Sequence, residues 1–324
     1  MQERDVLSVQ YFEDDKRFAD LINGFICGGR NVVDASQIRE CDRLITKVQK
    51  NTGKPKAGIL IRDVVREVHT DTRVMVITLE NQTDIHYAMP VRVLDGDSAA
   101  YSRQLRKRRK EHREKRDLTN AEYVSGFGKG EKLVPVVTVV VYFGTDPWDG
   151  PRSLKEMLDL SEIPEEMAAM VNDYPIHLLE VRRYGCLDNF QTDLRYVFGF
   201  LQNEQDGKKL KNYIEENSSA LEHMEEDAYD LISVMSRSKE LAVMKKSNRN
   251  EGGDYNMCKG LREWMADERR QGKELGREEG RKEGEEYGIR LAKQVIRMDL
   301  SGLSRDEIAA GCRITREYVD MILG

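Results

Sequence analysis

The stretch IRDVVREVHTDTRVMVITLENQ, residues 61–82, decides the fold of this chain. β-Branched and apolar residues dominate two runs within it, 61–68 and 73–82. The polar sequence Thr70-Asp71-Thr72 separates them. Two strand-like runs around a short polar break are typical of a β-hairpin, and we therefore expect an antiparallel strand pair here.

If the turn is centred between residues 71 and 72, Asp63 lies opposite Glu80. Directly opposed residues share a face with Cβ atoms roughly 5 Å apart, and strand alternation adds Gln82 to that face. Two carboxylates so close repel each other unless a cation lies between them, and hard oxygen ligands suit Mg²⁺ or Mn²⁺. Two alternatives stay open: an ion pair with Arg92, or two solvated surface charges.

Composition indicates a soluble intracellular protein with room for two or three domains. The chain has 324 residues, of which 39% are hydrophobic and 34% charged. Its five cysteines are scattered without a C-x-x-C pair, which favours free thiols in a reducing cytoplasm. No stretch is long and apolar enough to span a bilayer, so we expect no membrane association.

One basic segment interrupts an acidic chain. Residues 101–116, YSRQLRKRRKEHREKR, contain nine Lys or Arg and two Glu, a local charge of +7. Because the whole chain has a net charge of −6, the remainder carries −13. A concentrated basic block is a footprint that phosphate binding can use, although a solvated helix face has the same composition.

Strand-like and helical patterns mix over the first 200 residues, and helical patterns dominate afterwards. We expect a helix over Phe18–Ile26, a short segment over 34–49, and a helix from about Ser98 through the basic block. The further expectations are a strand at Val134–Phe143, a helix at Ser153–Leu160, a strand at Ile176–Val181, and helices from Asn189 onward.

Glycine recurs every fourth residue in the second half of the chain. Gly272, Gly276, Gly280, Gly284 and Gly288 lie in QGKELGREEGRKEGEEYG. Five helical glycines cost about 5 kcal/mol relative to alanine, so the segment is either a helix-pairing stalk or a charged tether. The tail over 303–324 has a local charge of −1 and predicts a short helical hairpin for packing or oligomerisation.

A series of short sequence words resembles the recombination-promoting nuclease family, a transposase-like group within the PD-(D/E)xK nuclease superfamily. The words in chain order are Phe18-Ala19-Asp20-Leu21-Ile22-Asn23, Glu40-Cys41-Asp42, Arg62-Asp63, Leu79-Glu80-Asn81-Gln82, Met89-Pro90-Val91-Arg92, Asp97 with Tyr101 and Gln104, Val141-Tyr142-Phe143-Gly144 and Trp148-Asp149-Gly150-Pro151. Met257-Cys258-Lys259, the glycine repeat and the helical tail also look typical of that family. The likeness covers nearly the whole chain.

The resemblance implies an α/β fold with a restriction-endonuclease-like mixed sheet flanked by helices, followed by an all-helical C-terminal region. The expected domains are a PD-(D/E)xK-like nuclease domain over 1–205, a helical region over 206–262, a charged stalk or tether over 263–290, and a helical hairpin over 291–324. We expect a homo-oligomer formed through the C-terminal helical region.

The resemblance also assigns roles to residues. Asp63 and Glu80 match the metal-binding acids, and Gln82 replaces the usual Lys. Glu40 matches an acid from the helix before the hairpin, and Asp42 competes with it for that role. Expected contacts to double-stranded DNA come from Gln104, Arg103, Arg106, Lys107, Arg108, Arg109 and Lys110.

The implied activity is a Mg²⁺- or Mn²⁺-dependent DNA endonuclease of low sequence specificity, associated with recombination or mobile elements. The alternative is a catalytically weak or inactive DNA-binding or assembly protein that keeps the nuclease fold. Gln82 motivates this alternative, because its amide orients water without supplying the positive charge of a Lys.

Overall fold

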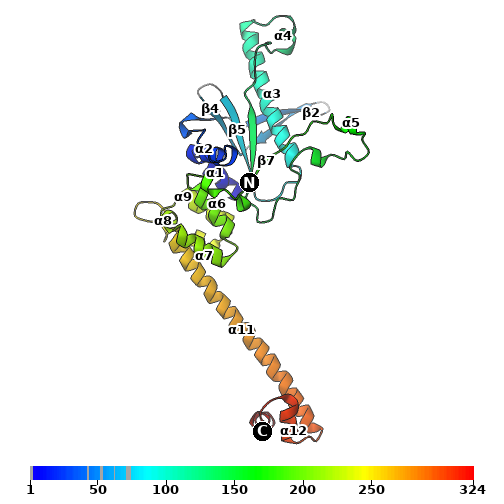
Figure 1. Cartoon of the computed structure of the whole chain (residues 1–324), viewed down its shortest axis with the longest axis vertical. Coiled ribbons are helices and arrows are strands. Elements are labelled where there is room, and N and C mark those ends of the chain that lie inside the picture. The colour runs from blue at the N-terminus through cyan, green and yellow to red at the C-terminus, as the bar shows by residue number, and fades with distance from the viewer. Residues whose placement is uncertain (1–2, 42–43, 52–53, 62, 71–73) are drawn as a thin grey trace. The chain divides into compact units, whose positions relative to one another are not determined.

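A five-stranded mixed sheet forms the centre of the first unit of the protein (Figure 1). The computed structural model describes residues 3–41, 44–51, 54–61, 63–70 and 74–324, and it divides the chain into two compact units, Met1–Gly260 and Leu261–Gly324. The sheet strands, in spatial order, are β1 (Ile38–Glu40), β4 (Val64–His69), β5 (Val74–Gln82), β6 (Val136–Tyr142) and β7 (His177–Glu180). Strands β1, β4 and β5 pair antiparallel, whereas β5, β6 and β7 pair parallel.

The expected hairpin exists, with the expected register. Val64 pairs with Leu79 and His69 pairs with Val74, so continuing the ladder brings Asp63 opposite Glu80. The centre of the turn, residues 71–73, lies outside the described residues. The α/β class, the strand expected at Val134–Phe143 and the strand expected at Ile176–Val181 are likewise confirmed.

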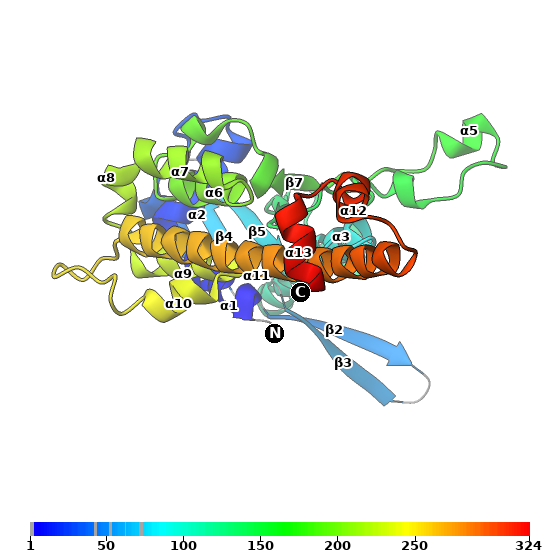
Figure 2. The ribbon, with the colours of Figure 1, turned by 90° about the horizontal axis from the view of Figure 1, so that it is seen from below.

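Two expectations before the hairpin are wrong. Ile61 does not belong to the hairpin, because it ends β3 (Lys54–Ile61), which pairs with β2 (Leu44–Asn51) as a separate two-stranded ribbon (Figure 2). The acid-bearing segment before the hairpin is not helical either. A 3-10 turn at Ala35–Gln37 leads directly into β1, because strand β4 offers an edge on which Ile38–Glu40 forms a ladder.

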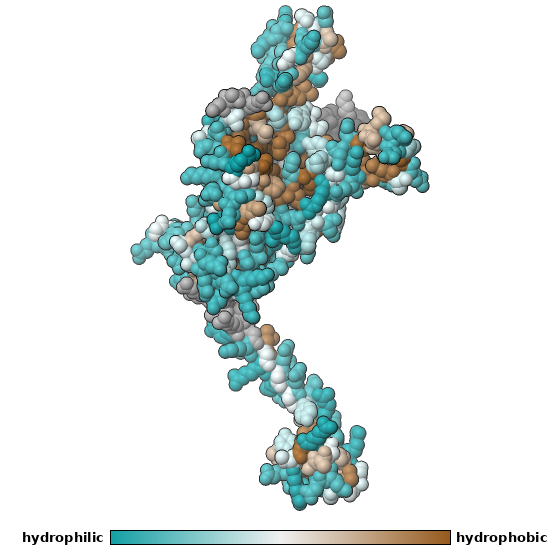
Figure 3. All heavy atoms as spheres, in the orientation of Figure 1, coloured by the Kyte–Doolittle hydropathy of each residue, from teal (hydrophilic) through white to brown (hydrophobic). Residues whose placement is uncertain are grey.

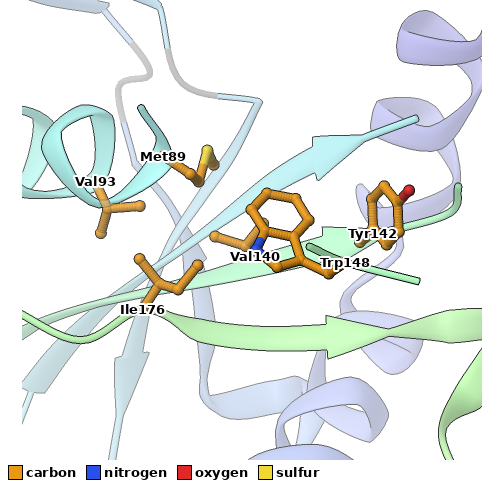
Figure 4. Close-up of a cluster of buried hydrophobic side chains, with 6 residues drawn as sticks. All are labelled: Met89, Val93, Val140, Tyr142, Trp148 and Ile176. Carbon is orange, nitrogen blue, oxygen red and sulfur yellow. The ribbon is translucent and has the colours of Figure 1, made fainter. Parts of the chain in front are cut away.

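Helix α3 (Met89–Lys115) covers one face of the sheet. It begins nine residues before the expected start at Ser98, because Pro90 occupies its first turn and Met89 and Val93 are buried. These two side chains pack against Val140, Tyr142, Trp148 and Ile176 in one apolar cluster (Figure 4). The second half of the helix carries the basic block on exposed positions.

The segment over Ser153–Leu160 forms only a 3-10 turn, Lys155–Met157, where a longer helix was expected. Ser153 bridges to Pro175 in a short β-contact, and the Asp173 carboxylate accepts a hydrogen bond from the Lys155 backbone nitrogen. These contacts to a distant segment extend the backbone and prevent a longer helix.

Helices from both ends of the first unit pack together. They are α1 (Glu3–Phe12), α2 (Asp15–Leu21), the following π-helix (Ile22–Ile26), α6 (Leu194–Asn203), α7 (Gly207–Glu216), α8 (Ser218–Leu221), α9 (Glu226–Met235) and α10 (Lys239–Met244). The short helices α4 (Asn120–Ser125) and α5 (Glu165–Ala168) lie in the connections on either side of β6. The helix expected over Phe18–Ile26 is confirmed, with Asp14 capping its start.

The second unit contains all but the first residues of α11 (Met257–Leu300), together with α12 (Arg305–Cys312) and α13 (Arg316–Leu323). The glycine repeat is helical and lies within α11. Leu291 and Val295 of α11 pack against Ile308, Cys312 and Val319 of the two short helices. Within the described ranges, no helix has the length and apolar character needed to cross a membrane.

Arg17 joins the helices at the two ends of the first unit. It is buried, its Nε and Nη2 atoms donate to both oxygens of Asp193 at 3.0 and 2.9 Å, and Nη2 also reaches Glu225 at 2.6 Å. Removing one partner of a buried ion pair leaves the other charge uncompensated.

Arg17→Met should therefore lower the free energy of unfolding by about 3 kcal/mol, measured by urea denaturation. The matched control is Arg195→Met, because the Arg195–Asp188 pair is exposed and should contribute less than about 1 kcal/mol. Equal losses in the two variants would contradict the role of Arg17.

Candidate functional site

The structure brings Asp63 and Glu80 together at the end of the β4–β5 pair. Asp63 directly precedes β4, and its Oδ2 accepts a hydrogen bond of 2.8 Å from the backbone nitrogen of Asn81. Glu80 lies on β5, next to Asn81 in the sequence. The negative charge of Glu80 acts on the Asp63 carboxyl, so the two acids form one electrostatic unit.

Glu80 is a buried carboxylate on a central strand. Its exposed fraction is 1%. Arg92, in the first turn of α3, donates from Nε and Nη2 to the same oxygen, Oε2, at 3.0 and 2.9 Å. An ionised buried carboxylate requires such a partner. The ion pair considered from the sequence is thus present in the structure.

Asp63 has an unusual acidity. Burial and, after it, the neighbouring charge of Glu80 raise its pKa to about 6, against the opposing effects of the Asn81 hydrogen bond and Arg92. A carboxyl with such a pKa is partly protonated near neutral pH and gains from any cation that approaches. Two carboxylates whose repulsion is already visible in this way fit a hard divalent cation.

Gln82 lies two residues beyond Glu80 on β5, so alternation directs its side chain toward the same face. Its Nε2 atom donates to the Asn81 carbonyl at 2.8 Å. Asn81 itself faces the opposite side of the strand. Its buried amide makes no hydrogen bond within the part of the chain that the structure describes.

Glu40 lies elsewhere. It is an exposed residue on β1 and pairs with Arg66 on β4. Arg66 and Asp63 differ by an odd number of residues, so β-strand alternation places Glu40 on the face opposite the carboxylate pair. The expectation that a helical Glu40 approaches Asp63 is wrong on both counts, and Asp42 lies outside the described residues.

A different acid acts on Asp63 through its charge. Asp5 of α1 raises the pKa of Asp63 through its charge, and α1 packs against β5. The sequence offered only a weak signal for this residue, an acid on the first helical segment. Its proximity depends on how α1 docks, which local sequence does not determine.

The expected DNA contacts divide into groups along α3. Arg103, Lys107 and Arg108 line a cavity of about 300 Å³ between α3 and the sheet, floored by apolar residues including Val65 and Val76. Arg106 and Lys110 are exposed, and Arg109 donates from Nε to the Ser125 carbonyl at 2.9 Å.

Gln104 does not face the carboxylates. Its side-chain amide forms two hydrogen bonds, of 3.0 and 2.8 Å, to the backbone of Val134. Gln104 is also twelve residues beyond Arg92, about 18 Å along the helix. Gln104 was expected to contact DNA, whereas in the structure its amide is bound to the protein's own backbone.

The Asp63–Glu80 pair offers few protein ligands to a metal ion. Among the residues that the structure describes, no group of three or more His, Cys, Asp or Glu side chains is arranged to hold a metal ion. Asp63 and Glu80 supply two carboxylates to a cation, and its other ligands would be water or substrate, as Mg²⁺ prefers.

Comparisons of the chain with protein-family models, with curated proteins and with solved structures gave no match.

The raised pKa of Asp63 predicts how stability depends on pH. The folded protein holds this proton more tightly than the unfolded chain. The free energy of unfolding therefore falls as the pH rises from about 4 through 6 and Asp63 ionises. Asp63→Asn keeps an oxygen acceptor for Asn81 without the charge. In EDTA it should stabilise the protein at pH 8, by on the order of 1 kcal/mol, and have no effect near pH 3.

Urea denaturation at both pH values tests this prediction. Asp34→Asn is the control, because hydrogen bonds from Ser36 lower the pKa of that exposed carboxyl, and this variant should gain no stability at pH 8. A destabilised Asp63→Asn protein at pH 8 would contradict the burial of an ionised Asp63.

Proposed function

We propose that this protein is a metal-dependent DNA endonuclease of the PD-(D/E)xK type, with little sequence specificity. The observation that carries the proposal is the Asp63–Glu80 pair, opposed across β4 and β5 and electrostatically coupled. The mixed sheet, antiparallel at β4–β5 and parallel at β5–β6, supports a restriction-endonuclease-like core. The words shared with the recombination-promoting nucleases support an association with recombination or mobile DNA.

Asp63 and Glu80 would hold Mg²⁺ or Mn²⁺ in this proposal. The cation would supply Lewis-acid polarisation of the phosphate and activation of a water molecule. Gln82 lies on the same strand face, where its amide can orient that water by hydrogen bonds. The basic half of α3 supplies phosphate contacts without base readout, which accords with low sequence specificity.

The Arg92–Glu80 ion pair favours a second function. The guanidinium occupies Oε2 of the carboxylate that a cation requires. A protein in which this pair persists would bind DNA through α3 without cutting it. This alternative is a DNA-binding or assembly protein with a nuclease fold. Like the endonuclease it would bind DNA, but it would not cleave it.

Plasmid nicking by the full-length protein separates the two functions. With Mg²⁺ or Mn²⁺ the wild type should convert supercoiled plasmid to nicked circles, and Asp63→Asn should lower the rate by about 100-fold or more, because it removes a charge that holds the cation. Asp84→Asn is the matched control, since Asp84 is an exposed acid two residues after β5.

Equal cleavage by the wild type and Asp63→Asn would remove this site from the reaction. Plasmid retention without cutting, across several divalent cations, would establish the alternative function instead. Loss of cleavage in both Asp63→Asn and Asp84→Asn would point to a general loss of structure, which circular dichroism checks.

We also propose that the protein forms a homo-oligomer through its C-terminal helical region. Leu275, Tyr287 and Ile289 of α11 are large apolar residues that are more than half exposed. At Gly276, Gly280, Gly284 and Gly288 an added Cβ atom would meet nothing within 4 Å, so these positions leave space for a close helix.

Ile289→Glu should therefore shift the full-length protein toward the monomer in sedimentation velocity, because a charge replaces a contact side chain. The control is Val243→Glu, an equally drastic change at an exposed position outside α11. A wild-type protein that sediments as a monomer would refute the proposed assembly.

A further inference from the structure

The end of helix α3 folds back on itself to form a small structured tip, which we call the α3–α4 tip (residues 109–131). The helix terminates at Arg116, whose left-handed backbone (φ 54°) turns the chain toward α4. Arg109 then donates to the Ser125 carbonyl, and His112 contacts Asp117 at 2.6 Å and Glu131 at 2.9 Å. These contacts hold α4 against the basic helix.

A hollow of about 530 Å³ lies in this tip. Its charged lining is basic: Arg109, Arg113 and Arg116. Its remaining lining includes Tyr123 and Val124 of α4. The hollow therefore combines cationic groups with an aromatic and an aliphatic side chain on one surface.

The acids near the hollow are engaged elsewhere. Asp117 and Glu131 contact the His112 ring, and these hydrogen bonds raise the pKa of that histidine. Glu122 accepts hydrogen bonds from the backbone nitrogens of Thr119 and Lys129. These carboxylates do not line the hollow, whose own charged side chains are arginines, and the hollow therefore favours an anionic ligand.

Tyr123 and Val124 are unusually exposed for apolar side chains. Their exposed fractions are 75% and 87%, and apolar atoms interrupt the hydrophilic surface of the tip (Figure 3). An arginine cluster also attracts acidic peptides and phosphate, but these ligands do not require an aromatic ring to bind. A base does, because stacking on an aromatic side chain is a main source of affinity for single strands.

We propose that the α3–α4 tip binds unpaired nucleotides, with Tyr123 stacking on a base and Arg113 and Arg116 contacting the phosphates. The proposal rests on the nucleic-acid substrate of the proposed function and adds the form of that substrate. Arg113 is 21 residues beyond Arg92 on the same helix, about 32 Å along its axis. The unpaired segment is thus bound at a distance from the carboxylate pair.

Fluorescence anisotropy with full-length protein in EDTA tests the proposal without cleavage. The probes are a labelled oligothymidylate of about 12 nucleotides, a length within the usual range for single-strand sites, and a blunt duplex of the same length. Tyr123→Ala should weaken binding of the single strand by about fivefold or more, and binding of the duplex by less than about twofold, because duplex bases are already stacked.

Three variants serve as controls. Tyr123→Phe should retain single-strand affinity, since the ring remains. Tyr87→Ala, at another exposed tyrosine outside the tip, should leave both affinities unchanged. Arg113→Gln should weaken both probes and reduce the salt dependence of binding, because it removes a phosphate contact.

The proposal is overturned if Tyr123→Ala binds the single strand as the wild type does, if it weakens the duplex equally, or if no nucleic acid binds. Displacement of the oligothymidylate by polyglutamate at equal charge would also overturn it, in favour of an acidic protein partner. If the protein cleaves DNA but its binding does not depend on Tyr123, only the proposed nucleotide binding at the α3–α4 tip is refuted. Tyr123-dependent binding without Asp63-dependent cleavage would refute the nuclease alone.

Discussion

The buried carboxylate of Glu80 constrains the rest of the site. It lies on β5, between an antiparallel neighbour and a parallel one, where water is excluded and a partner is needed. Arg92 meets that need from the first turn of α3, which fixes the helix over this face of the sheet. Burial of Asp63 and then the charge of Glu80 raise the pKa of Asp63, so Glu80 links the docking of a helix to the chemistry of its neighbour.

Helix α3 serves two physical purposes along its length. Its first half is buried and carries Met89 and Val93 into the core. Its second half carries the basic side chains on exposed positions, where their charges remain hydrated, and the backbone turn at Arg116 returns the chain to form the α3–α4 tip. Because Arg92 and the basic surface lie along one continuous helix, α3 fixes the distance between the carboxylate pair and the basic surface. A flexible loop would let that distance vary.

Local sequence predicted the elements whose determinants are local. The β4–β5 register follows from alternation around a polar turn, and the strands at β6 and β7 follow from short apolar runs. The placement of Glu40 and the contact of Gln104 depend on partners distant in the chain: an edge offered by β4, and the backbone of Val134. The effect of the Asp5 charge on Asp63 depends on helix docking in the same way.

The sequence by itself determined that Asp63, Glu80 and Gln82 belong to one strand pair, because side chains alternate with a fixed period of two. It also determined the basic block, because charge is a property of composition. Only the tertiary structure decided that Glu80 is buried against Arg92, and that burial of Asp63 together with the Glu80 charge raises the pKa of Asp63 to about 6. Burial and the distances between charges depend on how helices and strands pack together, and a local sequence pattern does not determine that packing.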